Sequence, residues 1–285
     1  MSAKVVCISN LKGGVGKTTL VMALAEYLAG DTMYRKRVLA IDLDPQTNLT
    51  SALMSEDVWN VQFESRGLTL PYLFKHPEFF LSDHKKGNFV VKSSVSNVRN
   101  GNSFNCLHFI PSSPVLFEIQ EYLSSDFYPL TKLKPVHLLR ELLKPLLGNY
   151  DYILIDCPPN LNLIIKSAFL VSDFCIMPCV PNKMSIQGLD IVLRRIDAFN
   201  NENGHNLKPL GIILSRYNGT LAQTEYMRFI TENPFFPQVF NTKIPEKAKV
   251  AQALDFGGQV TYKQKYGESH QVMTQLAKEF IQKVG

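Results

Sequence analysis

The sequence predicts an α/β protein with a doubly wound, mostly parallel sheet flanked by helices. Short apolar, β-branched runs alternate along the chain with segments of helical spacing, which is typical of strands buried between layers of helices. Glycine-rich or acidic segments directly follow three of these runs, at the place where ligands bind in open α/β sheets. The chain has 285 residues, of which 45% are hydrophobic, and this is enough for one full core. We therefore expect a single domain over residues 1–285.

The elements can be placed in order along the chain. The first strand is expected at residues 4–9, and Leu20, Leu24 and Leu28 then share one face of a helix because they are four residues apart. Residues 56–105 mix aromatic side chains with an Asn- and Ser-rich stretch, and we expect a variable elaboration on the core there. Further strands are expected at 38–41, 106–110, 152–155, 174–178 and 210–214, and further helices near 136–147, 186–200 and 271–284.

The loop after the first strand has most of a phosphate-binding motif. Gly16, Lys17 and Thr18 form the second half of the pattern G-x-x-x-x-G-K-[ST]. Leu11 stands where the first glycine belongs, and Lys12 adds a second lysine. A strand, a glycine-rich turn and a helix aim backbone N–H groups and the positive helix end at a phosphate. We expect Lys17 to reach the β- and γ-phosphates of a nucleotide and the Thr18 hydroxyl to bind Mg²⁺.

Aspartates follow two later strands. Asp42 and Asp44 come after the run at 38–41, and Asp156 follows the run at 152–155 and precedes two prolines that end the strand. A carboxylate after a buried strand is typical of the Walker B position, which binds Mg²⁺ through water. Asp42 and Asp44 alone could also be charges that solubilise a strand end. The phosphate-binding loop upstream makes a nucleotide site the better interpretation.

Three segments together resemble the ParA/MinD family of deviant Walker A ATPases, and most of all its short, Soj-like ParA partition ATPases. They are the two-lysine loop, Asp42-Leu43-Asp44-Pro45-Gln46 and Asp156-Cys157-Pro158-Pro159. The resemblance implies a Mg²⁺-dependent ATPase with ATP and Mg²⁺ as cofactors, which forms a homodimer when it binds ATP.

The resemblance also implies roles for single residues. Lys12 would reach across the dimer to the partner's nucleotide, Asp44 would orient the attacking water, and Lys17 would be the second catalytic lysine. The implied metal site consists of Thr18 and Asp156, with Asp42 near the magnesium shell. The implied nucleotide-binding residues of the loop are Lys12, Gly13, Gly14, Val15, Gly16, Lys17, Thr18 and Thr19.

The resemblance resumes near the C-terminus. Residues 242–250 are similar to a family segment that usually reads Ile-Pro-Arg-Asn, in which the proline and the residue two beyond it pack on adenine. These two positions correspond to Pro245 and Lys247, and here Glu246-Lys247 replaces Arg-Asn. We therefore expect Pro245 and Lys247 to contact the base.

The family resemblance implies an ATPase for partition or positioning. Its ATP-bound dimer would bind DNA without sequence preference and leave it on hydrolysis, so that a plasmid, a chromosome origin or a protein cargo is segregated with a ParB-like or other adaptor. A net charge of +5, from 30 Lys and Arg against 25 Asp and Glu, agrees with a nucleic-acid partner. Lys243, Lys247 and Lys249 are the candidate DNA-binding residues, because spacings of two and four residues point them the same way in an extended segment.

The sequence also bears on localisation and on two alternative functions, a membrane switch and an iron–sulfur protein. No apolar run reaches the roughly 18 residues of a spanning helix, so we expect a cytoplasmic, nucleoid-associated protein. A MinD-like membrane switch needs an amphipathic basic tail. Residues 272–284 do carry an apolar stripe, but we expect it to pack in the core.

An iron–sulfur carrier or reductase is disfavoured, because Cys175 and Cys179 on one strand would lie roughly 13 Å apart. We expect all five cysteines to be core residues.

Overall fold

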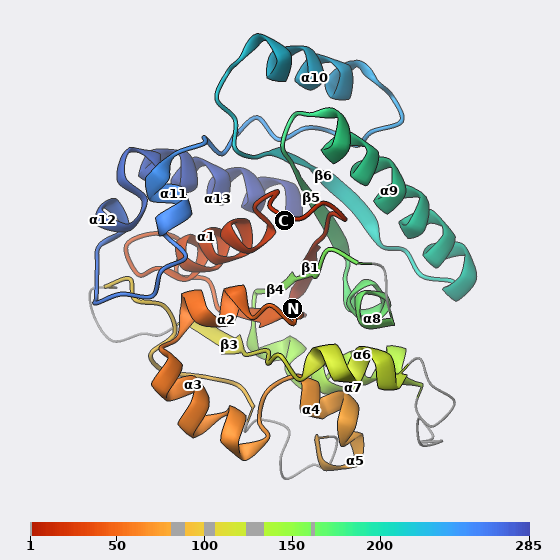
Figure 1. The fold of residues 1–285 in the computed structure, drawn as a ribbon, viewed down its shortest axis with the longest axis vertical. Helices are drawn as coiled ribbons and strands as arrows, with labels where there is room; N and C mark the ends of the chain where they lie inside the picture. The colour runs from red at the N-terminus through yellow and green to blue at the C-terminus, as the bar shows by residue number, and fades with distance from the viewer. Residues whose placement is uncertain (1, 81–88, 100–105, 124–133, 161–162) are drawn as a thin grey trace.

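The computed structural model describes residues 2–80, 89–99, 106–123, 134–160 and 163–285, and a six-stranded sheet forms the centre of this described part (Figure 1). The paired strands are parallel and follow the spatial order β3-β2-β4-β1-β5-β6. This confirms the predicted α/β fold, and each predicted strand is present. The bounds are β1 Lys4–Ile8, β2 Val38–Asp42, β3 Leu107–Ile110, β4 Tyr152–Asp156, β5 Phe174–Cys179 and β6 Lys208–Leu214.

Helices cover both faces of the sheet. α1 and α13 contact each other on one face, whereas α6, α7, α8 and α9 lie on the other (Figure 1). The bounds of the α-helices are α1 Lys17–Ala29, α2 Asn48–Leu53, α3 Glu56–Gln62, α4 Pro71–Lys75, α5 Pro77–Phe80, α6 Leu116–Leu123, α7 Pro135–Leu143, α8 Leu163–Val171, α9 Lys183–Asn203, α10 Leu221–Glu232, α11 Ala248–Gln252, α12 Tyr262–Tyr266 and α13 His270–Val284. Short 3₁₀ turns are η1 Glu64–Arg66, η2 Leu147–Asn149 and η3 Gly267–Ser269.

The last helix, α13, packs its apolar face into the core. Leu276 and Phe280 are fully buried, and the Phe280 ring lies 5.2 Å from that of Tyr152 on β4, centroid to centroid. The stripe that a membrane anchor would expose therefore faces the sheet, as expected. Within the ranges that the structure describes, no helix is long and apolar enough to span a bilayer.

The predicted elaboration over 56–105 is joined to the core wherever it is described. Phe74 of α4 is fully buried, Val91 pairs with Phe109 on β3, and Val98 pairs with Val260 near the C-terminus. Residues 81–88 and 100–105 of this segment lie outside the described residues.

Four of the five cysteines are core residues, as predicted, and Cys106 differs. Cys7 on β1, Cys157 after β4, and Cys175 and Cys179 on β5 are free and fully buried. Cys106, just before β3, is partly exposed.

Three loops meet at one edge of the sheet. β1 lies between β4 and β5, and Asp42 at the end of β2 is paired in register with Asp156 at the end of β4. Ile8, the last residue of β1, is also in register with Asp156. Because the strands are parallel, their carboxyl ends and the loops that follow them lie together, and this edge carries the candidate site.

Candidate functional site

The glycine-rich loop begins at a fixed asparagine. The Asn10 side chain donates through Nδ2 to the Pro178 carbonyl on β5 at 2.8 Å, and its Oδ1 accepts from the Lys12 backbone N–H at 3.0 Å. Gly188 of α9 makes room for this side chain, since a Cβ there would lie 2.7 Å from Asn10 Oδ1. Sequence reasoning missed both residues, and only Asn10, which directly precedes the loop, carried a local signal.

The second half of the loop is held by its backbone conformation and by β6. Gly14 and Gly16 have φ of 73° and 84°, which side chains other than glycine rarely adopt. Ser215, just after β6, donates its hydroxyl to the Val15 carbonyl at 2.6 Å. α1 then starts at Lys17, so the loop delivers the first N–H groups of this helix to the cavity described below.

Lys17 turns inward over its own loop. The residue is 7% exposed, and its ammonium donates to the Asn10 carbonyl at 3.1 Å and to the Lys12 carbonyl at 3.3 Å. Burial lowers the pKa of Lys17, and the carboxylates of Asp156 and Asp44 oppose that shift. A buried cation at the start of a helix is well placed to receive a phosphate group.

Lys12 points elsewhere. Its Nζ lies 4.0 Å from the sulfur of Met184 in the first turn of α9, and Met184 is 61% exposed. Lys12 is not among the described residues that line the cavity. The structure therefore separates the two lysines of the loop, one directed into the site and one along its outer surface.

Asp42, expected near the magnesium shell, is paired in register with Asp156 at the end of β4. It is fully buried, and it accepts from the Asp44 N–H at 2.9 Å and from the N–H and hydroxyl of Thr50 at 2.9 and 2.8 Å. Burial raises the pKa of Asp42 to about 7, while these hydrogen bonds oppose the rise. Both of its oxygens thus bind protein donors, and the carboxylate fixes the loop after β2 to α2.

Asp44 lines the cavity. The residue is 6% exposed, and Oδ1 accepts from the Gln46 N–H at 2.9 Å. Its carbonyl accepts from the Thr47 N–H at 3.0 Å, and Thr47, with φ of 55°, is the N-cap of α2. The carboxylate is held in one place by this turn and by the bond from its own N–H to Asp42.

Asp156 is a fully buried carboxylate at the end of β4. Neither of its oxygens forms a hydrogen bond of good geometry with the residues that the structure describes. Burial raises its pKa well above the ordinary value, the charge of Asp42 raises it further, and the nearby Thr18 hydroxyl opposes the rise. An unpaired buried carboxylate is costly unless a cation compensates it. Thr18 and Asp156 therefore fit a divalent cation that is bound directly or through water.

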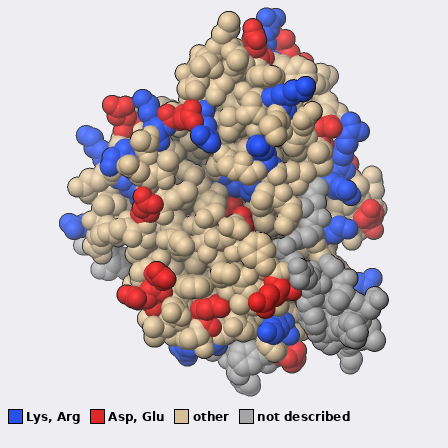
Figure 2. Space-filling model, viewed as in Figure 1, with Lys and Arg blue, Asp and Glu red and all other residues tan. Residues whose placement is uncertain are grey.

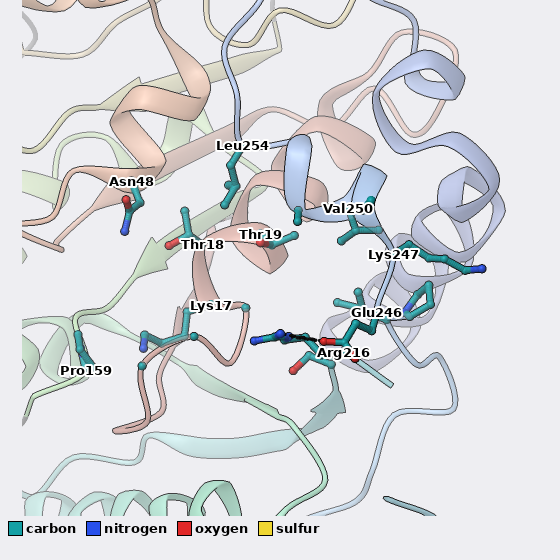
Figure 3. Close-up of a pocket in the computed structure, with 18 of the residues that line it drawn as sticks. Lys17, Thr18, Thr19, Asn48, Pro159, Arg216, Glu246, Lys247, Val250 and Leu254 are labelled. Carbon is teal, nitrogen blue, oxygen red and sulfur yellow. Dashed lines mark hydrogen bonds and ion pairs between the residues drawn. The ribbon is translucent and has the colours of Figure 1, made fainter. Parts of the chain in front are cut away.

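A cavity of about 650 Å³ joins these parts (Figure 3). The glycine-rich loop and the start of α1 form one side, and residues 244–254 form the other, with an apolar surface from Val250, Ala251 and Leu254. Small-molecule sites typically occupy about 300–1,000 Å³, so a nucleotide fits. The lining residues are Gly13, Gly14, Gly16, Lys17, Thr18, Thr19, Asp44, Gln46, Asn48, Pro159, Ser215, Arg216, Ile244, Pro245, Glu246, Lys247, Ala248, Val250, Ala251 and Leu254.

The segment expected to contact adenine faces the phosphate loop across this cavity. Pro245 and Lys247 both line it, so the structure brings them together with the loop residues that the sequence singled out. Lys247 begins α11 as its N-cap, and its ammonium lies 3.8 Å from Glu268.

The three candidate DNA-binding lysines do not share one extended segment. Lys243 Nζ packs 4.8 Å above the Tyr217 ring, Lys247 precedes α11 and Lys249 lies inside it. The assumed extended geometry is therefore wrong, because α11 starts between Lys247 and Lys249. On the face seen in Figure 2, basic side chains are interspersed with acidic ones.

Comparisons with known proteins agree with this geometry. The family model described as an AAA domain matches residues 3–209. A virulence plasmid ParA family protein, pGP5-D of Chlamydia psittaci, is 30% identical over 251 residues, which cover 88% of this chain and 84% of that protein. The chromosome partitioning protein ParA of Myxococcus xanthus is 27% identical over 257 residues, covering 89% and 79%. Among solved structures, the ATP complex of McdA from Cyanothece superposes with a TM-score of 0.75 at 24% identity, covering 98% of this chain and 96% of that one.

Proposed function

The chain belongs to the ParA family of ATPases, and we propose that it is a partition ATPase that hydrolyses ATP with Mg²⁺. One observation carries the proposal. Lys17, Asp44 and the buried Asp156 gather at one edge of the sheet, where Lys17 and Asp44 line the cavity. Among the residues that the structure describes, no hydrogen bond of good geometry satisfies the Asp156 oxygens.

Each residue at this edge has a distinct task in the proposed reaction. The N–H groups of the loop and the Lys17 ammonium bind the phosphates. Thr18 and Asp156 hold the Mg²⁺ ion, which neutralises phosphate charge when it is bound. Asp44 orients the water that attacks the γ-phosphate, since its carboxylate is fixed by Gln46 and faces the cavity. Asp42 keeps Asp44 in position through their hydrogen bond.

The proposed enzyme works as a dimer. Lys12 leaves its own cavity and lies on the outer surface beside the exposed Met184, so it is free to act on a nucleotide held by a second copy. A cation supplied in this way stabilises the charge that develops on the phosphates during hydrolysis.

We propose that the ATP-bound dimer binds DNA without sequence preference in the cytoplasm and leaves it on hydrolysis, moving a cargo through a ParB-like adaptor. The net charge of +5 supports this, as do Lys243, Lys247 and Lys249, of which the last two are exposed. The burial of the α13 stripe favours DNA over a membrane as the surface.

A binding experiment tests the proposal. Wild-type protein and the Asp44→Ala variant are mixed with duplex DNA of arbitrary sequence, or with anionic vesicles, in ATP, ADP or no nucleotide. We expect DNA binding with ATP only, and stronger retention by Asp44→Ala. Binding to vesicles but not to DNA, or equal DNA binding without nucleotide, would overturn the partition function.

A further inference from the structure

An arginine and a glutamate meet at the mouth of the cavity. Arg216 follows β6, and its Nε and Nη2 donate to Glu246 Oε1 at 3.0 and 2.8 Å, while Asn218 Nδ2 donates to Glu246 Oε2 at 3.2 Å. Arg216 and Glu246 both line the cavity, and Figure 3 shows the Arg216 side chain reaching into it from the loop after β6.

The backbone at Arg216 is in an unfavourable conformation. Its φ of 48° lies in the left-handed region, where residues other than glycine are uncommon. The carbonyl of Arg216 accepts from the Gln223 side chain at 3.1 Å, and the next N–H, of Tyr217, donates to the Ile244 carbonyl at 3.0 Å. A glycine would adopt this turn without strain. The strained backbone therefore indicates that the arginine side chain itself is needed at this position. Strained residues of this kind cluster at ligand sites.

The Arg216–Glu246 pair lies between the two ends of the cavity. Ser215, the residue before Arg216, bonds the phosphate loop at Val15, whereas Glu246 directly follows Pro245 in the opposite wall. A backbone bond from the Glu246 N–H to the Tyr217 carbonyl at 3.2 Å also joins the two walls. Because Glu246 neutralises the guanidinium, the pair is poorly suited to attract phosphate, but a planar guanidinium held by a carboxylate presents a flat face.

We propose that Arg216 contacts the nucleoside part of the bound nucleotide by stacking its guanidinium on the base, and that Glu246 is the positioning residue that holds it there. This rests on the proposed nucleotide site. A stacking contact is independent of the γ-phosphate, so Arg216 contributes equally to the binding of ATP and ADP.

Calorimetric titration with ADP and with a non-hydrolysable ATP analogue, both with Mg²⁺, tests this assignment. We expect Arg216→Ala to raise Kd for both nucleotides about tenfold, which is 1.4 kcal/mol. Arg216→Lys should lose most of the same affinity, because an ammonium has no planar face. Glu246→Gln should weaken binding in the wild-type background and have no further effect in Arg216→Ala, as a positioning residue requires.

Arg228→Ala is the matched control. Arg228 also bonds a glutamate, Glu232 at 2.7 Å, but on the exposed surface of α10, and its loss should leave both affinities unchanged. Unchanged affinity in Arg216→Ala and Arg216→Lys would overturn the proposal. A loss confined to the ATP analogue would place the guanidinium on the γ-phosphate and overturn the stacking assignment. Wild-type protein that binds neither nucleotide would instead overturn the proposed function.

Discussion

At the scale of single residues, neighbouring aspartates have different environments. Asp42 is buried and accepts three hydrogen bonds, whereas Asp44, two residues later, faces the cavity. The sequence pattern places both after the strand but cannot assign their hydrogen bonds, because the partner of Asp42, Thr50, lies on a helix that had no clear signal.

Replacing Asp44 by Ala should separate binding from hydrolysis. ATP affinity should stay within a few-fold of wild type, since Lys17 and the loop N–H groups hold the phosphates, but turnover should fall by a factor of about 10²–10⁴, the range for a positioned acid or base. Phosphate release and nucleotide titration measure the two quantities. A variant with the wild-type turnover would show that Asp44 does not orient water.

The two loop lysines should fail in different ways. Lys17→Ala should weaken nucleotide binding itself, whereas Lys12→Ala should keep binding and lose hydrolysis by about 10³–10⁵, as with cations supplied across an interface. Sedimentation of the Asp44→Ala protein should show dimers with ATP and monomers with ADP. A strictly monomeric protein at saturating ATP and Mg²⁺ would rule out the role of Lys12 in the partner's site.

The buried carboxyl groups give stability a defined pH dependence. Burial raises the pKa of Asp42 to about 7 and that of Asp156 above its ordinary value, so the folded protein binds more protons than the unfolded chain from about pH 4 upward. The free energy of unfolding without nucleotide should therefore fall as pH rises from 5 to 7.5, by on the order of 1–3 kcal/mol.

Urea unfolding at several pH values measures this, and two variants provide the comparison. Asp156→Asn should flatten the slope because it removes one of the titrating groups. Asp151→Asn should leave the slope unchanged, because the hydrogen bond with Arg37 lowers the pKa of Asp151 and moves its titration to lower pH. A stability that rises between pH 5 and 7.5 would contradict the environment described for Asp42 and Asp156.

At the scale of elements, one buried ion pair joins the two ends of the chain. The side chains of Glu26 on α1 and Lys265 on α12 are 1% and 3% exposed and lie 2.6 Å apart. The Tyr266 hydroxyl donates to Glu26 at 2.5 Å, and Lys265 donates to the Asn97 side-chain oxygen at 2.9 Å. This cluster ties the helix that follows the phosphate loop to the helix beyond the opposite cavity wall.

Lys265→Ala should destabilise the protein by about 3–5 kcal/mol, because it leaves the Glu26 carboxylate buried and without its cation. Lys263→Ala is the matched control, since Lys263 is exposed on the same helix and should change stability by less than about 0.5 kcal/mol. Equal unfolding midpoints in urea for the two variants would show that the pair does not contribute.

The long periodic elements were predictable and the short ones were not. All six strands and the helices α1, α7, α9 and α13 follow from apolar runs and helical spacing, because burial between layers imposes those patterns. α11 and α12 have five residues each, too few for a periodic signal. Because Lys249 lies in α11, Lys243 and Lys249 do not belong to one extended segment as predicted.

At the scale of the whole molecule, the phosphate half of the site was predictable from local motifs. On the opposite wall, the family resemblance singled out Pro245 and Lys247 but not the Arg216–Glu246 pair. The loop lysines and the strand-end aspartates stand in local motifs. The Arg216–Glu246 pair joins residues 30 apart in sequence, and Glu26–Lys265 joins residues 239 apart. Such contacts depend on the tertiary fold, which brings the loop after β6 to the phosphate loop and α13 beside α1.

The affinity of the complete dimer for DNA should fall as the salt concentration rises. If about six phosphates are neutralised, log K should fall against log salt with a slope near −5, at roughly −0.9 per contact. Lys243→Glu with Lys249→Glu should abolish binding and leave basal ATP hydrolysis unchanged. Filter binding over a salt series measures this, with Lys4→Glu, at the other end of β1, as the control. A flat salt dependence would contradict contacts to phosphate.

The place of β1 in the sheet also governs when the protein can become active during its synthesis. β1 is made first, yet its two neighbours are β4 and β5, so it stays unpaired until residues 152–156 and 174–179 have left the ribosome. One cavity wall, residues 244–254, emerges later still. A nascent chain therefore carries the phosphate loop long before it can enclose a nucleotide, and meanwhile exposes an apolar strand that chaperones would need to shield.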